Sequence, residues 1–169
     1  MADAVDLGLV ATGGLLPGWR LAQAFAPGGF DPNFYRRQNT GSFAISLNRS
    51  LFGSFGNDVL IGGVGNDYIS GYGFVGSQEI DILAGNLGAD TFALGDFLAP
   101  YYGGPSVGII ADYKRVEGDI VQLSGRGVEN YSFYYDNLLG SSATDTFVLY
   151  NNDVIGIVVD TTNIAFNLV

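Results

Sequence analysis

The sequence contains no cysteine and no histidine among its 169 residues. Thiol nucleophiles, Ser-His-Asp triads, histidine-ligated zinc and imidazole bases are therefore excluded, and disulfide bonds cannot stabilise the fold. Basic residues are also scarce, because seven Lys and Arg face 17 Asp and Glu, which gives a formal net charge of −10. This charge makes nucleic acids and anionic membrane surfaces poor partners and hard cations good ones.

The first 18 residues lack the features of a targeting or membrane segment. They carry Asp3 and Asp6 where a signal peptide needs positive charge, and their apolar run is short and interrupted by glycine. We therefore expect neither a secretory leader nor a transmembrane helix in this stretch, and no membrane insertion.

The residues that are abundant predict a mainly β protein. The chain has 26 glycines, ten Tyr and twelve Phe, a composition that helices of ordinary length do not tolerate and that sheets favour. Its acids are almost all Asp, which is typical of turns and of oxygen-ligated metal sites; Glu occurs only at positions 79, 117 and 129.

Composition changes twice along the chain, which predicts three segments. Residues 1–52 read as a mixed capping segment with one or two short helices and a strand over 42–47. Residues 53–93 are repetitive, and residues 94–169 form a β-rich capping region. In this last region we expect strands at 107–113, 120–123, 131–135, 146–150, 154–159 and 164–169, arranged as an antiparallel meander, with a hairpin turn at 151–153.

The middle segment is an internal repeat with a period of nine residues. Its four units are GSFGNDVLI (53–61), GGVGNDYIS (62–70), GSQEIDILA (76–84) and GNLGADTFA (85–93), with five additional residues at 71–75. Every unit has Gly first, Asp sixth and an apolar residue eighth. One apolar position in nine is too few for a helix face, whereas a six-residue turn followed by a three-residue strand fits this pattern.

Such a coil would alternate its strands between two sheets, so each turn would stack on its second neighbour. This predicts Asp58 above Asp81 on one edge and Asp67 above Asp90 on the other, with Leu60 against Leu83 and Ile69 against Phe92 in a narrow core. Carboxylates about 4.8 Å apart repel unless a divalent cation lies between them.

The glycines complete the predicted metal site, because they permit tight bends that expose carbonyl oxygens. A ring of oxygens selects Ca²⁺. The candidate ligating residues are Asp58, Asp67, Asp81, Asp90, Gly53, Gly56, Gly62, Gly63, Gly65, Gly76, Gly85 and Gly88. The alternative is that these are ordinary Gly-Asn-Asp hairpin turns without metal.

Residues 62–70 match the calcium-binding nonapeptide G-G-x-G-x-D-x-U-x at every defined place, so this segment resembles the RTX, or hemolysin-type, proteins. The stretches GSQEIDILAGNLGADTFALGD and IIADYKRVEGDIVQLSG look like the cyanobacterial members of that family. The resemblance implies a parallel β-roll that binds Ca²⁺, type I secretion through an uncleaved C-terminal signal, and folding in extracellular calcium. A terminal core strand is the alternative for residues 164–169.

Some residues depart from the repeat pattern. Ser54, Ser77 and Glu79 stand where glycine is expected, and Glu79 either adds a ligand or, as we favour, is a solvated residue. Asp96, Asp112 and Asp119 fall outside the repeat frame. We expect them to lie in caps and turns of the C-terminal region, with a further ion there as the alternative.

The sequence contains no convincing active site, so we expect a non-enzymatic calcium-binding module that is extracellular or on the cell surface. The alternatives are the C-terminal folding module of a secreted enzyme and a glycan-binding surface protein. Tyr131, Phe133 and Tyr135 alternate like a strand facing a core. The other interpretation is an aromatic platform for cell-surface polysaccharide or for self-association, formed by Tyr101, Tyr102, Tyr131, Phe133, Tyr134 and Tyr135.

Overall fold

The computed structural model describes residues 47–72 and 78–169, and within them it is an all-β protein, as predicted. The strands are β1 Ser50–Phe52, β2 Val59–Val64, β3 Tyr68–Ser70, β4 Ile80–Leu87, β5 Thr91–Ala93, β6 Val107–Ile110, β7 Ile120–Leu123, β8 Tyr131–Asp136, β9 Asp145–Tyr150, β10 Asp153–Val158 and β11 Phe166–Leu168. Two short 3₁₀ helices lie at Arg115–Glu117 and Val128–Asn130. The helices predicted in the N-terminal segment lie outside the described residues. The strand predicted at 42–47 also lies outside them, except for Leu47.

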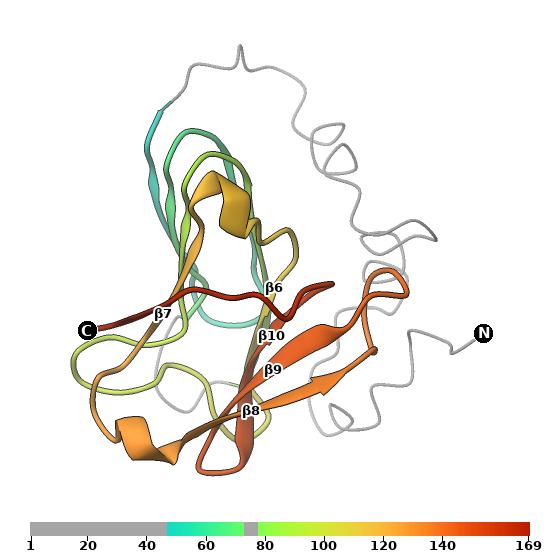
Figure 1. Ribbon diagram of the computed structural model, residues 1–169. Coiled ribbons are helices and arrows are strands. Elements are labelled where there is room, and N and C mark those ends of the chain that lie inside the picture. The colour runs from blue at the N-terminus through green and yellow to red at the C-terminus, as the bar shows by residue number, and fades with distance from the viewer. Residues whose placement is uncertain (1–46, 73–77) are drawn as a thin grey trace.

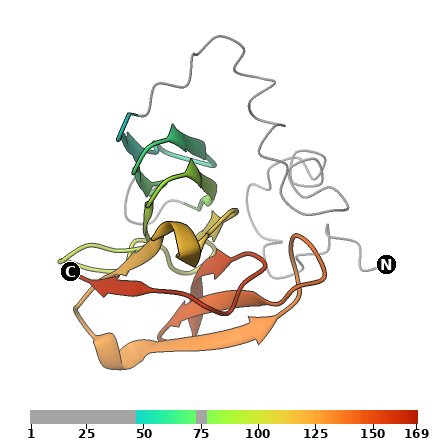
Figure 2. The same cartoon turned by 45° about the horizontal axis from the view of Figure 1, so that its top comes forward.

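The strands form two sheets that the chain visits alternately. One sheet has the order β1-β3-β5-β7-β11 and the other has the order β2-β4-β6-β10-β9-β8. From β1 to β7 all pairings are parallel. Figure 2 shows the short strands of the repeat region stacked as successive layers, with the C-terminal strands continuing the stack. This arrangement is a parallel β-roll.

Second-neighbour stacking occurs with the predicted register. Leu60 pairs with Leu83 across β2 and β4, and Ile69 pairs with Phe92 across β3 and β5. Ile69, Leu83 and Phe92 are fully buried. The single apolar residue of each repeat therefore points into the narrow space between the sheets, where the next layers add Ile110 and Val121.

The C-terminal part differs from the predicted meander in its pairing. Antiparallel pairing is confined to β8, β9 and β10, which Figure 1 shows lying together. In contrast, β6 pairs in parallel with β4 and with β10. Strand β7 pairs in parallel with β5 and with β11. The roll therefore continues beyond residue 93, because β6 pairs with the free edge of β4 and β7 pairs with the free edge of β5. Whether the predicted segments fold as separate units stays a prediction.

Local turn chemistry explains the antiparallel hairpin. Asn151 and Asn152 both have positive φ, 52° and 64°, between β9 and β10. Two consecutive residues of this kind make a turn whose twist matches the flanking strands, and Asn tolerates the left-handed region. The predicted turn at 151–153 is confirmed.

Strand β8 is exposed, contrary to the interpretation that it faces the core. It is the edge strand of its sheet. Tyr131 is partly buried, whereas Phe133 and Tyr135 are 39% and 52% exposed, and Tyr134 between them is 54% exposed. Sequence alternation signals a buried face only where another layer covers that face. On β8 the ring of Phe133 contacts that of Phe166 of β11, with 4.8 Å between the centroids, but this single contact leaves both rings 39% exposed.

The predicted absence of a transmembrane helix concerns the first 18 residues, which lie outside the described residues. No helix in residues 47–72 and 78–169 has the length and apolar character needed to cross a bilayer.

Candidate metal site

The aspartates at position 6 form a ladder along each edge of the roll. The backbone N–H of Asp58 donates to Oδ1 of Asp81 at 2.9 Å, and that of Asp67 donates to Oδ1 of Asp90 at 2.8 Å. We call these two ladders the Asp58 edge and the Asp67 edge. The structure thus brings the four predicted aspartates together in the two predicted pairs, and the carboxylates of Asp81 and Asp90 each accept a backbone N–H of the paired turn.

The Asp67 edge has a third member that the repeat frame excluded. The N–H of Asp90 donates to Oδ1 of Asp119 at 2.9 Å, which is the same contact one layer further on. Asp119 precedes β7 as Asp90 precedes β5. The sequence gives little indication of this third member. Of the nonapeptide pattern it keeps only the aspartate and, two residues later, the apolar Val121.

Glycine at position 1 makes room for the carboxylate of its own repeat. A Cβ atom added to Gly62 would lie 2.2 Å from Asp67 Oδ2, and one added to Gly85 would lie 2.0 Å from Asp90 Oδ2. Gly53 has the same relation to Asp58 Oδ2, at 2.7 Å. No side chain larger than hydrogen fits at these positions unless the carboxylate moves.

In the third repeat this place is taken by Gly71, which the sequence analysis did not select. A Cβ on Gly71 would lie 2.4 Å from Asp81 Oδ2, and the predicted Gly76 lies outside the described residues. Gly53, Gly62 and Gly71 keep the nine-residue spacing. The additional residues therefore enter after the first glycine of the turn, and the second-neighbour pairing of the following strand is preserved.

The remaining predicted glycines shape the turns. Gly56, Gly63, Gly65 and Gly88 all have positive φ, between 90° and 135°. Gly88 also approaches the backbone of the preceding turn so closely that an added Cβ would lie 1.9 Å from the carbonyl oxygen of Gly65. This close approach packs the turns 62–67 and 85–90 directly against each other.

Two carboxylate oxygens on the Asp67 edge are buried without a hydrogen-bond partner. They are Oδ2 of Asp67 and Oδ2 of Asp90, in residues that are 2% and 1% exposed. On the Asp58 edge the equivalent oxygens are satisfied, because Asp58 Oδ2 accepts the N–H of Ser54 at 2.7 Å and Asp81 Oδ2 accepts the hydroxyl of Tyr102 at 2.9 Å. Buried anionic oxygens without donors are costly, and a cation bound on the Asp67 edge would offset that cost.

The pKa values of Asp81 and Asp90 show that burial disfavours their charged forms when no metal is present. Burial raises the pKa of Asp90 to about 7, and the nearby carboxyls of Asp119 and Asp67 add to the rise. Burial also raises the pKa of Asp81 to about 7, with contributions from Glu79 and Asp58. A divalent cation beside these groups would favour their charged forms and reverse the shift.

A hard cation fits the donor set of the Asp67 edge. In residues 47–72 and 78–169 no three acidic side chains converge to form a metal site by themselves. Asp67 and Asp90 would therefore share the ion with carbonyl oxygens of the glycine turns, an all-oxygen set that suits Ca²⁺.

Glu79 is fully buried, so the interpretation that it is solvated is wrong.

Comparison with known proteins supports a calcium-binding repeat in this part of the chain. Residues 50–73 and 74–96 match the family model described as the RTX calcium-binding nonapeptide repeat, which comprises four copies of the unit. A search of curated proteins gave no significant match.

Proposed function

We propose that this chain, which residues 50–73 and 74–96 identify as an RTX calcium-binding repeat protein, holds calcium on its Asp67 edge and requires it to keep the repeat turns stacked. The single observation that carries the proposal is the pair of buried oxygens, Oδ2 of Asp67 and Oδ2 of Asp90, that no donor among the described residues satisfies. Asp67 and Asp90 would be the charged ligands. When bound, calcium supplies positive charge that offsets the repulsion between stacked carboxylates.

The ladder contacts explain how binding would be coupled to folding. Asp81 accepts the N–H of Asp58 and Asp90 accepts that of Asp67, so these two carboxylates are in place only when turns distant in sequence are stacked. Ion binding to such a site therefore contributes directly to the free energy of folding. The second predicted site, between Asp58 and Asp81, stays a prediction.

Isosteric substitutions at the two edges test this assignment. Asp67→Asn keeps an oxygen for the ladder and puts an NH₂ group in place of one carboxylate oxygen. We expect it to weaken the tightest calcium site at least tenfold, a loss of about 1.4 kcal/mol. Isothermal titration calorimetry measures this affinity directly.

Asp58→Asn is the matched control for that experiment. It removes the same charge where the carboxylate already accepts the N–H of Ser54, so the tightest site should keep its affinity within about threefold. Equal effects of the two substitutions would contradict the assignment to the Asp67 edge. Absence of any calcium heat in the unaltered protein would contradict the calcium-binding function as a whole.

We further propose that the chain acts outside the cell or at the cell surface, after type I export, as a non-enzymatic folding or structural module. Extracellular calcium modules bind with dissociation constants of roughly 10⁻⁴ to 10⁻³ M, so such a site would fill only outside the cell. The net charge of −10 supports an ion-dependent fold, because charge repulsion opposes compaction when no counterion is bound. Attachment to a secreted enzyme is a compatible arrangement.

A second candidate function is binding of surface polysaccharide or self-association through β8. The exposed Phe133, Tyr134 and Tyr135 on this edge strand favour it, because aromatic rings pack against sugars and edge strands pair with other chains.

We expect Tyr134→Ser combined with Tyr135→Ser to abolish retention of labelled polysaccharide in the presence of calcium. Phe97→Ser is the control, since Phe97 is an exposed aromatic elsewhere. Equal retention by all three proteins would exclude β8 as the glycan site, and sedimentation analysis of the same variants would reveal self-association.

A further inference from the structure

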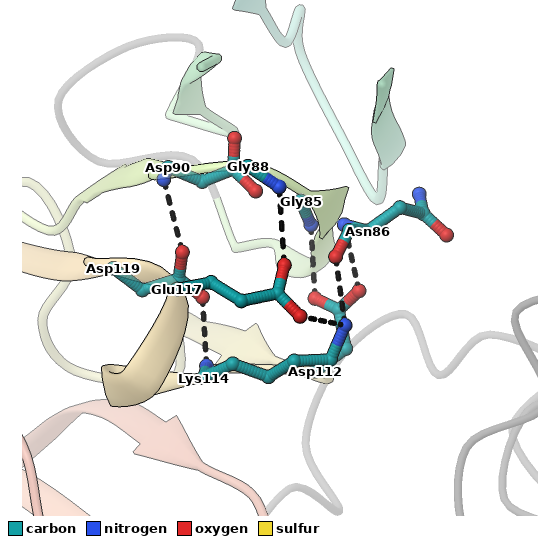
Figure 3. Close-up of polar contacts among 8 residues, drawn as sticks. All are labelled: Gly85, Asn86, Gly88, Asp90, Asp112, Lys114, Glu117 and Asp119. Atoms are coloured by element: carbon teal, nitrogen blue, oxygen red, sulfur yellow. Dashed lines mark hydrogen bonds and ion pairs between the residues drawn. The ribbon is translucent and has the colours of Figure 1, made fainter. Parts of the chain in front are cut away.

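The last turn of the Asp67 edge, residues 111–119, carries a concentration of charged residues. Asp112, Lys114, Glu117 and Asp119 lie together beside the turn 85–90, as Figure 3 shows. Asp119 continues the ladder by accepting the N–H of Asp90. The space between these two turns therefore corresponds to the space between the turns 62–67 and 85–90, where we place the calcium ion.

Lys114, the only lysine in the chain, extends its ammonium group from the turn 111–119 to the turn 85–90. Its ammonium group donates to the carbonyl oxygen of Asn86 at 2.8 Å and lies 3.1 Å from Oε1 of Glu117. Its backbone N–H donates to Oδ2 of Asp119 at 2.7 Å. A fixed positive charge thus contacts both a turn carbonyl and a carboxylate, the two kinds of oxygen that a calcium ion would use there.

All the carboxylate oxygens of this turn have partners. Asp112 accepts the N–H groups of Gly85 and Asn86, at 2.9 and 2.8 Å. Oε2 of Glu117 accepts the N–H of Gly88 at 3.1 Å. This differs from Asp67 and Asp90, whose Oδ2 atoms are buried without a donor. Beside Asp67 and Asp90 no positive group of the described residues satisfies the Oδ2 atoms, whereas in the turn 111–119 the Lys114 ammonium supplies a positive charge from the protein itself.

A similar contact exists at the opposite end of the same edge. Arg49 donates its backbone N–H to Oδ1 of Asp67 at 2.7 Å, and its guanidinium Nη1 donates to the carbonyl oxygen of Gly62 at 2.8 Å. A basic side chain therefore contacts a turn carbonyl at each end of the ladder, and the two unsatisfied carboxylates lie between them.

We propose that the Lys114 ammonium takes the place of a calcium ion between the turns 85–90 and 111–119 and so ends the calcium-binding array on this edge. The inference rests on the proposed calcium function and adds a residue that limits the number of ions. Removing the ammonium while keeping the fold leaves Oε1 of Glu117 and the carbonyl oxygen of Asn86 facing a gap, with the carboxylate of Asp119 on the same turn. That gap has the oxygen chemistry of a further calcium site.

The test compares Lys114→Met with the unaltered protein, with Lys114→Arg and with Arg115→Met. Methionine keeps the length of the side chain without its charge. Arg115→Met makes the same charge change at an exposed neighbour. The measurements are the number of calcium ions bound per chain, by calorimetry, and the melting temperature in EDTA and in 10 mM calcium.

We expect Lys114→Met to bind one more calcium ion per chain than the unaltered protein, to melt at a lower temperature in EDTA, and to recover most of that loss in calcium. Lys114→Arg and Arg115→Met should keep the original number of ions. An unchanged number in Lys114→Met, an equal loss of melting temperature with and without calcium, or failure to fold in calcium would each overturn the inference. If the unaltered protein binds no calcium, the proposed function fails instead.

Discussion

Transfer of the protein from 10 mM calcium into EDTA is expected to lower the free energy of unfolding by about 1.4 to 2.7 kcal/mol for each ion lost, given dissociation constants of 10⁻⁴ to 10⁻³ M. The loss should concentrate in the layers that carry Asp67 and Asp90, because their buried Oδ2 atoms then have no positive partner. Denaturant titrations followed by circular dichroism measure the total change. Hydrogen exchange of the backbone amides locates it.

Magnesium provides the control for the calcium experiment. It has the same charge but requires a small octahedral site and retains its water, so 10 mM magnesium should restore much less stability than calcium does. Identical unfolding curves in EDTA and in calcium would contradict a calcium-dependent roll. Equal rescue by both metals would reduce the effect to screening of a highly acidic chain.

Substitution of Phe92 by alanine should cost about 3 to 5 kcal/mol in the free energy of unfolding. Phe92 is fully buried and pairs with Ile69 on one side and Val121 on the other, so its ring fills the core across three layers of one sheet. It also lies 6.5 Å, between ring centroids, from Tyr113. Since a narrow roll has few side chains that can move into the cavity, most of the lost packing would not be recovered.

Phe55→Ala is the matched control for this substitution. Phe55 lies in the first repeat turn and is 76% exposed, so its loss should change stability by no more than about 0.5 kcal/mol. Both variants are measured by guanidinium denaturation in saturating calcium. A cost at Phe92 as small as that at Phe55 would mean that the apolar eighth position does not form the core.

Some parts of this fold follow from the sequence alone and others do not, for physical reasons. The register Leu60 with Leu83 followed from the period, because a nine-residue coil that alternates between two sheets can stack only on its second neighbour. Gly71 was missed because the sequence does not reveal where an insertion enters a turn. The surrounding structure determines this, through the glycine that lies against the carboxylate of Asp81. The exposed β8 was misread since alternation does not identify the layer opposite.

Spacing of glycine and aspartate was enough to predict the roll and its two edges, because a short period leaves the backbone one way to pair and each side chain one direction to point. Folding in three dimensions decided which edge has unsatisfied carboxylates and where the ladder ends. Those properties depend on donors from remote segments, such as the Tyr102 hydroxyl at Asp81 and the Lys114 ammonium at Asn86, whose positions no local pattern encodes.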